Sequence, residues 1–131
     1  MKEYEPIPKD TERVASEIVD AALRVHKKLG PGLLESVYEI CLDYELEKRG
    51  LKVKRQTVLP VVYEDVSLDA GLRLDLLVEN RVIVELKAVE KMIPLYDAQL
   101  LTYLKLAEKR LGLLINFNVT LLKQGIKRIV L

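Results

Sequence analysis

Two acidic residues and a lysine lie on neighbouring strands of a predicted β-hairpin. The strands alternate apolar and polar side chains, and a loop over residues 79–81 is predicted to join them. In that register Asp75 lies across from Glu85, and Lys87 follows on the same face. Directly opposed side chains have Cβ atoms roughly 4.5 to 5.5 Å apart, and like charges there destabilise the sheet unless something neutralises them. A bound cation would do so, and a pair of carboxylates suits Mg²⁺, which keeps water and phosphate among its ligands.

The same spacing has a second interpretation that needs no site. Arg73 and Lys87 are also opposite each other in this register, so the two bases and the two acids could form a mixed-charge ladder on a solvated sheet face. Periodicity alone favours this ladder, because antiparallel sheets commonly expose one polar face.

Two further polar residues occupy predicted helices at positions that do not decide their roles. Glu35 is in the first turn of the helix after Gly32, where an acid interacts favourably with the helix dipole by about 0.3 to 1 kcal/mol. On a helical wheel Glu35 lies at the rim of the apolar stripe, and Glu45 lies nearer its middle. Gln99 lies at the edge of a later helix's apolar face, where capping of a backbone group and contact with the carboxylates are both open.

The elements that must position these residues follow from hydrophobic periodicity. The pattern predicts helices over residues 10–29, 34–49 and 94–109, and strands over residues 52–63, 68–78, 82–88, 111–117 and 126–131. Residues 119–124 are too short to assign. Because no repeat or linker separates these elements, we expect one domain over residues 1–131, with a mixed α/β sheet flanked by helices.

Composition narrows the classes of function. The 131 residues are 50% hydrophobic and 31% charged, as in a folded globular domain, and the formal net charge of +1 lacks the strong positive charge of many nucleic-acid binders. Any basic surface must therefore be local. Two candidate clusters are Lys48, Arg49, Lys52, Lys54 and Arg55, and Lys123, Lys127 and Arg128. An ordinary helix end and an edge strand protected by lysine are the alternatives.

Other features exclude structural zinc and predict the compartment. Cys41 is the single cysteine, so it cannot form an internal disulfide or a thiolate metal cluster. The segment 1–10 has acids and prolines where a secretory signal needs an apolar run, and no stretch approaches the ~18 apolar residues of a membrane span. We expect a cytoplasmic protein without a membrane partner.

Gly32, Glu35 and Tyr38 form a Gly-x-x-Glu-x-x-Tyr signature, and with it the chain resembles the small bacterial and archaeal GxxExxY proteins. Residues 68–75, 83–87, 98–103 and 113–118 also carry the resemblance. That family is grouped with the PD-(D/E)XK nuclease-like superfamily, which holds a divalent metal through an Asp and a Glu-x-Lys on adjacent strands. The resemblance implies an α/β fold with a PD-(D/E)XK nuclease-like core, in which helices flank a mixed central sheet. That sheet contains an antiparallel three-stranded meander and further strands.

The resemblance also implies roles for residues of this chain. Asp75, Glu85 and Glu35 would hold Mg²⁺ or Mn²⁺, Lys87 would be the catalytic lysine, and Gln99 would be a polar position of the site. Leu74 departs from the proline that precedes the aspartate in the superfamily. Tyr38 and Tyr103 match aromatic positions of the family and receive no role.

The implied activity is metal-dependent hydrolysis of phosphodiester bonds in DNA or RNA, so nucleic acid is the expected partner. The alternative is a catalytically silent nuclease-like module that binds nucleic acid or a protein. Because 131 residues leave no room for a separate recognition domain, a homodimer or a protein partner is also open.

Overall fold

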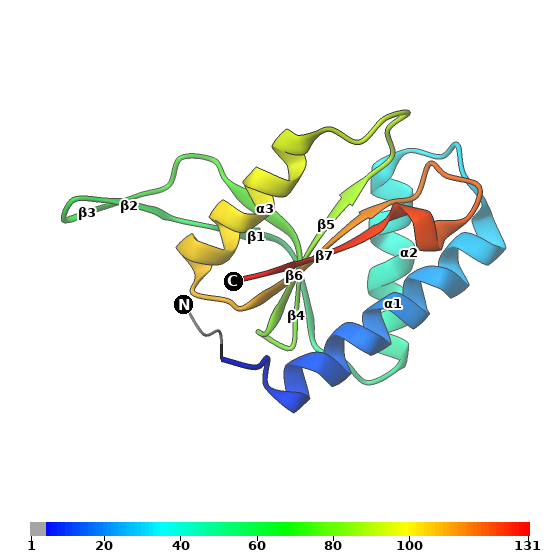
Figure 1. The fold of residues 1–131 in the computed structure, drawn as a ribbon, viewed down its shortest axis with the longest axis horizontal. Helices are drawn as coiled ribbons and strands as arrows, with labels where there is room; N and C mark the ends of the chain where they lie inside the picture. Colours follow the sequence, from blue (N-terminus) through cyan, green and yellow to red (C-terminus); the bar gives the residue numbers. More distant parts are fainter. Residues whose placement is uncertain (1–4) are drawn as a thin grey trace.

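A five-stranded mixed sheet forms the centre of the fold in a computed structural model that describes residues 5–131 (Figure 1). The strand order is β1-β4-β5-β6-β7. The strands are β1 Val53–Val58, β4 Arg73–Val78, β5 Val82–Lys87, β6 Leu111–Asn116 and β7 Ile126–Val130. Strands β1, β4 and β5 form an antiparallel meander, β6 runs parallel to β5, and β7 runs antiparallel to β6. The predicted fold class and the predicted meander are therefore confirmed.

Three helices cover the two faces of this sheet. They are α1 Lys9–Leu29, α2 Glu35–Lys48 and α3 Pro94–Ala107, close to the predicted bounds. Within the unassigned segment 119–124, a short 3₁₀ helix, η1, spans Leu122–Gly125. Residues 1–4 of the predicted non-signal segment lie outside the described residues. In the described part of the chain, no helix combines the length and the apolar run that a membrane span needs.

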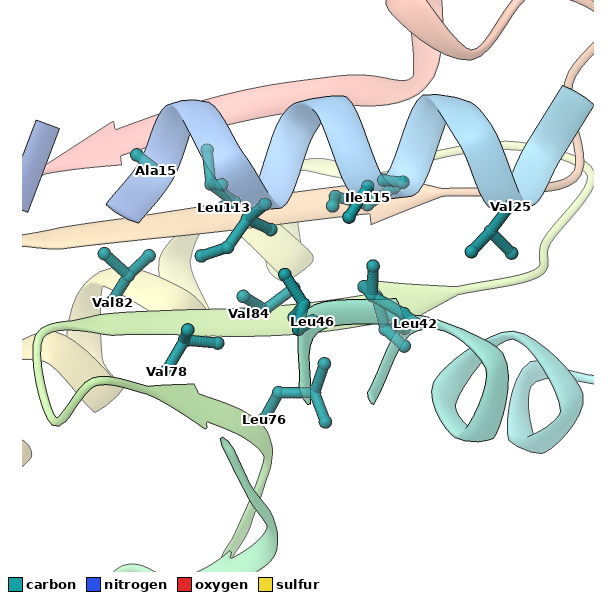
Figure 2. Close-up of a cluster of buried hydrophobic side chains, with 14 of the residues drawn as sticks. Ala15, Val25, Leu42, Leu46, Leu76, Val78, Val82, Val84, Leu113 and Ile115 are labelled. Atoms are coloured by element: carbon teal, nitrogen blue, oxygen red, sulfur yellow. The ribbon is translucent and has the colours of Figure 1, made fainter. Parts of the chain in front are cut away.

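Two apolar clusters fix the helices on the sheet. Helices α1 and α2 share one buried cluster with one face of the strands, as Figure 2 shows for Val25, Leu42 and Leu46. Helix α3 packs Leu100 and Leu104 into a second cluster on the opposite face. Strands β5 and β6 are thus buried on both sides of the sheet, which explains their nearly continuous apolar sequences.

Strand β4 changes the phase of its alternation at Asp75. The alternation predicted for this strand places Leu74, Leu76 and Val78 on one face. Instead Leu74 packs in the cluster with α3, together with Leu77, whereas Leu76 and Val78 pack in the cluster with α1 and α2. The prediction was wrong because strict alternation requires a continuous ladder, and the ladder is interrupted at this residue.

A two-stranded arm interrupts the meander. Strands β2 Val61–Tyr63 and β3 Val66–Leu68 form a separate sheet that projects from the body (Figure 1). The predicted strands over residues 52–63 and 68–78 are therefore each divided. The chain leaves the central sheet at Pro60, which has no N–H for a ladder, and the backbone N–H of Leu59 donates to the Leu72 carbonyl across the base of the arm at 3.0 Å.

Candidate functional site

The carboxylates of Asp75 and Glu85 replace a pair of the β4–β5 ladder. The predicted pairing of Val78 with Val82 is confirmed, but the ladder between the two strands ends at Leu76 and Val84. Beyond it, the backbone N–H of Asp75 donates to Glu85 Oε2 at 2.8 Å, and the backbone N–H of Leu86 donates to Asp75 Oδ2 at 2.8 Å. The register brings the two acids together, and their side chains accept the hydrogen bonds that strand carbonyls would otherwise accept.

Burial makes this pair electrostatically unfavourable when both groups are charged. The Glu85 side chain is 9% exposed, and burial, followed by the charge of Asp75, raises the pKa of Glu85 to about 8. Burial also raises the pKa of Asp75, with a further contribution from the charge of Glu39. An unpaired carboxylate in such a place favours its neutral form unless a cation approaches.

The mixed-charge ladder is not formed. Arg73 pairs with Asp69 at 3.2 Å, and the β4–β5 ladder does not extend to Arg73 and Lys87. Lys87 Nζ instead lies 4.5 Å from the centroid of the Tyr96 ring on α3, a cation–π contact. Burial raises the pKa values of Asp75 and Glu85, and the charge of Lys87 partly opposes this rise, so the ammonium lies near the acidic pair.

Glu35 approaches the pair from the first residue of α2. Its pKa is raised by partial burial and then by the charge of Asp75, while the charge of Lys87 lowers it. Glu45, which lies nearer the middle of the apolar stripe, pairs instead with Arg24 and Arg49. The helical wheel gave no reason to prefer Glu35 over Glu45 as the acid near the pair. The reason is the position of Glu35 at the start of α2, where the charge of Asp75 acts on it.

Tyr38 positions the start of α2. Its buried hydroxyl donates to the Gly30 carbonyl at 2.6 Å and accepts from the Leu33 backbone N–H at 3.2 Å. Its ring stacks on Phe117, with centroids 4.5 Å apart and planes 10° apart. Tyr38 thus ties the glycine turn before α2 to the core, and this contact fixes where Glu35 begins the helix.

Two polar residues near the pair were missed by sequence reasoning. Glu39, one turn after Glu35 on α2, is 7% exposed and accepts from the side chain of Arg55 at 3.3 Å. Gln56 Nε2 donates to Glu39 Oε1 at 2.6 Å and to Asp75 Oδ1 at 3.4 Å. The four-residue spacing from Glu35 could have indicated Glu39. Nothing in the sequence indicated Gln56, because the inserted arm hid the register of β1.

Two residues of helix α3 bear on the site: Gln99, which was predicted to belong to it, and Tyr103, which received no predicted role. Burial raises the pKa of Tyr103, followed by the charges of Glu85 and then Asp75, so its phenol lies near the pair. Gln99 is half-buried one turn earlier, and no hydrogen bond joins it to either carboxylate within residues 5–131. Its role at the site stays a prediction.

Ion pairs within the chain engage two residues of each basic cluster. Arg49 pairs with Glu17, Asp20 and Glu45, and Arg55 pairs with Glu39 and Asp43. Lys127 pairs with Asp97, and Arg128 pairs with Glu12. These pairs favour the alternative of ordinary solvated surfaces over two continuous basic patches.

The donor set fits a hard divalent cation that keeps other ligands. Asp75 and Glu85 supply carboxylate oxygens, and Glu85 Oε1 has no hydrogen-bond partner among the described residues. Within residues 5–131, no three Asp, Glu, His or Cys side chains by themselves form a metal-holding group. A two-carboxylate site completed by water and phosphate is the arrangement that Mg²⁺ usually takes, whereas Ca²⁺ prefers six to eight oxygen ligands.

Comparison with known families agrees with this geometry. The family model of the PD-(D/E)XK nuclease superfamily matches residues 12–129, from α1 to β7. The chain belongs to the PD-(D/E)XK nuclease superfamily. Members of this superfamily generally use divalent metals. Searches of curated proteins and of solved structures gave no match. In this PD-(D/E)XK domain the assignment of the superfamily's aspartate and Glu-x-Lys to Asp75, Glu85 and Lys87 stays a prediction.

Proposed function

We propose that this PD-(D/E)XK domain is a nuclease that hydrolyses phosphodiester bonds of DNA or RNA with Mg²⁺ or Mn²⁺. The observation that carries the proposal is the pair formed by the half-buried Asp75 and the buried Glu85 beside Lys87. Amide side chains could accept the same two backbone hydrogen bonds without opposed charges, so the hydrogen bonding of the strands does not by itself require two carboxylates. Such a pair does meet the need of a divalent cation for anionic oxygen ligands.

Each residue of the proposed site has a distinct task. Asp75 and Glu85 would hold the ion, and Glu35 would approach it from the first residue of α2. When bound, a divalent ion supplies Lewis-acid chemistry, because it polarises phosphoryl oxygens and makes water more acidic. Lys87 places a positive charge where negative charge grows on the phosphate in the transition state. Gln99 is proposed as a polar contact from α3.

The charge of the arm limits where a polyanionic substrate could bind. The arm between β1 and β4 is unsuited to bind a polyanion, because residues 57–72 contain Glu64, Asp65 and Asp69 and no lysine or arginine. We therefore propose that the phosphate contacts lie off the arm.

Two finer assignments accompany this proposal. The Gly-x-x-Glu-x-x-Tyr signature of Gly32, Glu35 and Tyr38 supports placement in the GxxExxY family. The match over residues 12–129 supports a single domain over residues 1–131. A homodimer or a protein partner would supply the sequence specificity that one small domain lacks.

The test is a cleavage assay with the purified protein on labelled single- and double-stranded DNA and RNA, with Mn²⁺, with Mg²⁺ and with EDTA. We expect cleavage with either ion, none with EDTA, and a loss of at least about 100-fold in Lys87→Ala. Equal cleavage by Lys87→Ala, prepared identically, would reveal a contaminating nuclease. Absence of cleavage together with retained nucleic-acid binding would favour the non-catalytic module.

A further inference from the structure

Gln56 occupies an unusual backbone position directly beside the proposed site. Its neighbours on β1 pair regularly with β4, Arg55 with Leu76 and Thr57 with Leu74, but Gln56 and Asp75 are not a ladder pair. The φ angle of Gln56 is 49°, in the left-handed region that side chains other than glycine, asparagine and aspartate rarely adopt. A strained residue persists only where surrounding contacts hold it, and such residues cluster at functional sites.

The contacts that hold Gln56 are two carboxylates. Nε2 donates to Glu39 Oε1 at 2.6 Å and to Asp75 Oδ1 at 3.4 Å. An ionised carboxylate only accepts, so both bonds require the NH₂ group of the amide and fix which way the amide faces. The two hydrogens of Nε2 allow it to serve both acceptors, and the left-handed backbone places it between them.

Glu39 is an anchor for this amide and is not free to bind a cation. Its Oε2 accepts from Nε and Nη2 of Arg55, both at 3.3 Å, and its Oε1 accepts from Gln56. Both oxygens are therefore occupied in a side chain that is 9% exposed. The anchor holds Gln56 firmly at 2.6 Å and leaves the longer bond at Asp75.

Asp75 is thus held at both oxygens, firmly at one and loosely at the other. The backbone N–H of Leu86 donates to Oδ2 at 2.8 Å, and Gln56 donates to Oδ1 at 3.4 Å. The long hydrogen bond from Gln56 limits rotation of the Asp75 carboxylate. Because the bond is weak at this length, little free energy is lost when Oδ1 binds another partner. Residues in contact with a metal ligand commonly orient it in this way.

We propose that Gln56 is a positioning residue that, anchored by Glu39, holds the Asp75 carboxylate in the orientation that receives a divalent cation. This inference rests on the proposed function and adds to it a specific residue on β1. It explains why the chain keeps a strained glutamine at a position where glycine would fit the backbone more easily.

The test compares two substitutions that remove the amide and differ in backbone strain. Gln56→Met keeps a side chain of similar length at the same positive φ, whereas Gln56→Gly relieves the strain. Glu64→Gly is the matched control, because Glu64 has a φ of 55° at the turn between β2 and β3, away from the carboxylates. For each protein we would measure the melting temperature in EDTA. We would also measure the Mn²⁺ dissociation constant from the electron paramagnetic resonance signal of free Mn²⁺.

We expect Gln56→Gly to melt at a higher temperature than Gln56→Met while both bind Mn²⁺ about 10-fold more weakly than the parent protein. Glu64→Gly should bind Mn²⁺ as the parent does. Parent-like Mn²⁺ affinity in both Gln56 variants would overturn the inference and leave the proposed function intact. If Gln56→Gly regained the parent's Mn²⁺ affinity together with a higher melting temperature, Gln56 would be a merely structural residue. A parent protein that does not bind Mn²⁺ would overturn the proposed function and the inference together.

Discussion

Asp75 and Glu85 each accept a hydrogen bond from the backbone of the opposite strand, at 2.8 Å in both directions. The side chains thereby satisfy N–H groups that would lack partners where β4 and β5 stop pairing. One oxygen of each carboxylate is fixed by the fold, and the geometry of the pair does not depend on a bound ion. The pair is held in place before any cation arrives, and the energetic penalty of this arrangement is electrostatic.

That penalty predicts an unusual dependence of stability on pH. Below about pH 4.5 Glu85 is protonated in both the folded and the unfolded chain. Between about 4.5 and about 8 the unfolded chain loses this proton and the folded chain retains it. Because the folded state binds more protons, the free energy of unfolding of the metal-free protein falls as pH rises through this range, by on the order of 2–4 kcal/mol. Denaturant titrations in EDTA from pH 4.5 to 9 measure this slope.

Glu85→Gln is the control for this prediction. The amide keeps an oxygen that accepts from the Asp75 N–H but cannot ionise. We expect the variant to be more stable than the parent at pH 8 by about 1–3 kcal/mol and to show a flatter pH profile. Identical slopes in the two proteins would assign the pH dependence to other groups.

Divalent ions should reverse this penalty and release a proton. At pH 7 Glu85, with a pKa of about 8, holds a proton that must leave before its carboxylate binds a cation. We expect Mn²⁺ binding at pH 7 to release about one proton, measured by calorimetry in buffers of different ionisation enthalpy, and to raise the melting temperature. Acidification to pH 5 should abolish the rise.

Asp75→Asn tests whether the ion binds at this pair. The variant keeps the shape of the side chain and removes one charge, so it should weaken Mn²⁺ binding at least about 10-fold. Without metal it should be as stable as the parent or more so, because burial disfavours the charge of Asp75. An unchanged Mn²⁺ response would place the cation elsewhere on the protein.

Local pattern was enough to predict most elements of the fold. The helices and the strands β5 and β6 carry long periodic or apolar runs, and the structure places them close to the predicted bounds. The pairing of Val78 with Val82 was also predictable, because a short loop fixes the register of a hairpin. That register is what brought Asp75 near Glu85.

The remaining features depend on contacts between distant segments. The shift in alternation at Asp75 arises from side chains that accept backbone hydrogen bonds, and a hydropathy pattern does not register such bonds. The arm joins two short strands to the meander without altering the local strand signal of residues 52–63. Gln56 contacts Glu39 and Asp75 only when β1 and α2 are packed together. Its neighbours in the sequence therefore gave no sign that this glutamine belongs to the site.

Tyr38 gives a prediction about how the glycine turn supports the site. Tyr38→Phe removes the bonds to the Gly30 carbonyl and from the Leu33 N–H but keeps the stacking on Phe117. We expect a loss of about 1–2 kcal/mol in the free energy of unfolding, measured by urea titration. Tyr44→Phe on the same helix is the control, because Tyr44 is 68% exposed and should show no change. A parent-like stability of Tyr38→Phe would mean that the turn is held by other contacts.

Lys87 gives a prediction in which binding and cleavage move in opposite directions. Its positive charge lies near Glu35, Asp75 and Glu85, where it repels a cation and attracts a phosphate. Lys87→Met keeps an unbranched chain against the Tyr96 ring and removes the charge.

At pH 8, we expect the variant to bind Mn²⁺ as tightly as the parent or more tightly, because one nearby positive charge is gone. Cleavage should nevertheless fall at least about 100-fold, because the charge that develops on the phosphate loses its partner. Parallel titrations of Mn²⁺ binding and of cleavage rate measure both effects on the same preparation. If Mn²⁺ binding and cleavage weakened together, Lys87 would act by organising the carboxylates, and its proposed contact with the phosphate would be wrong.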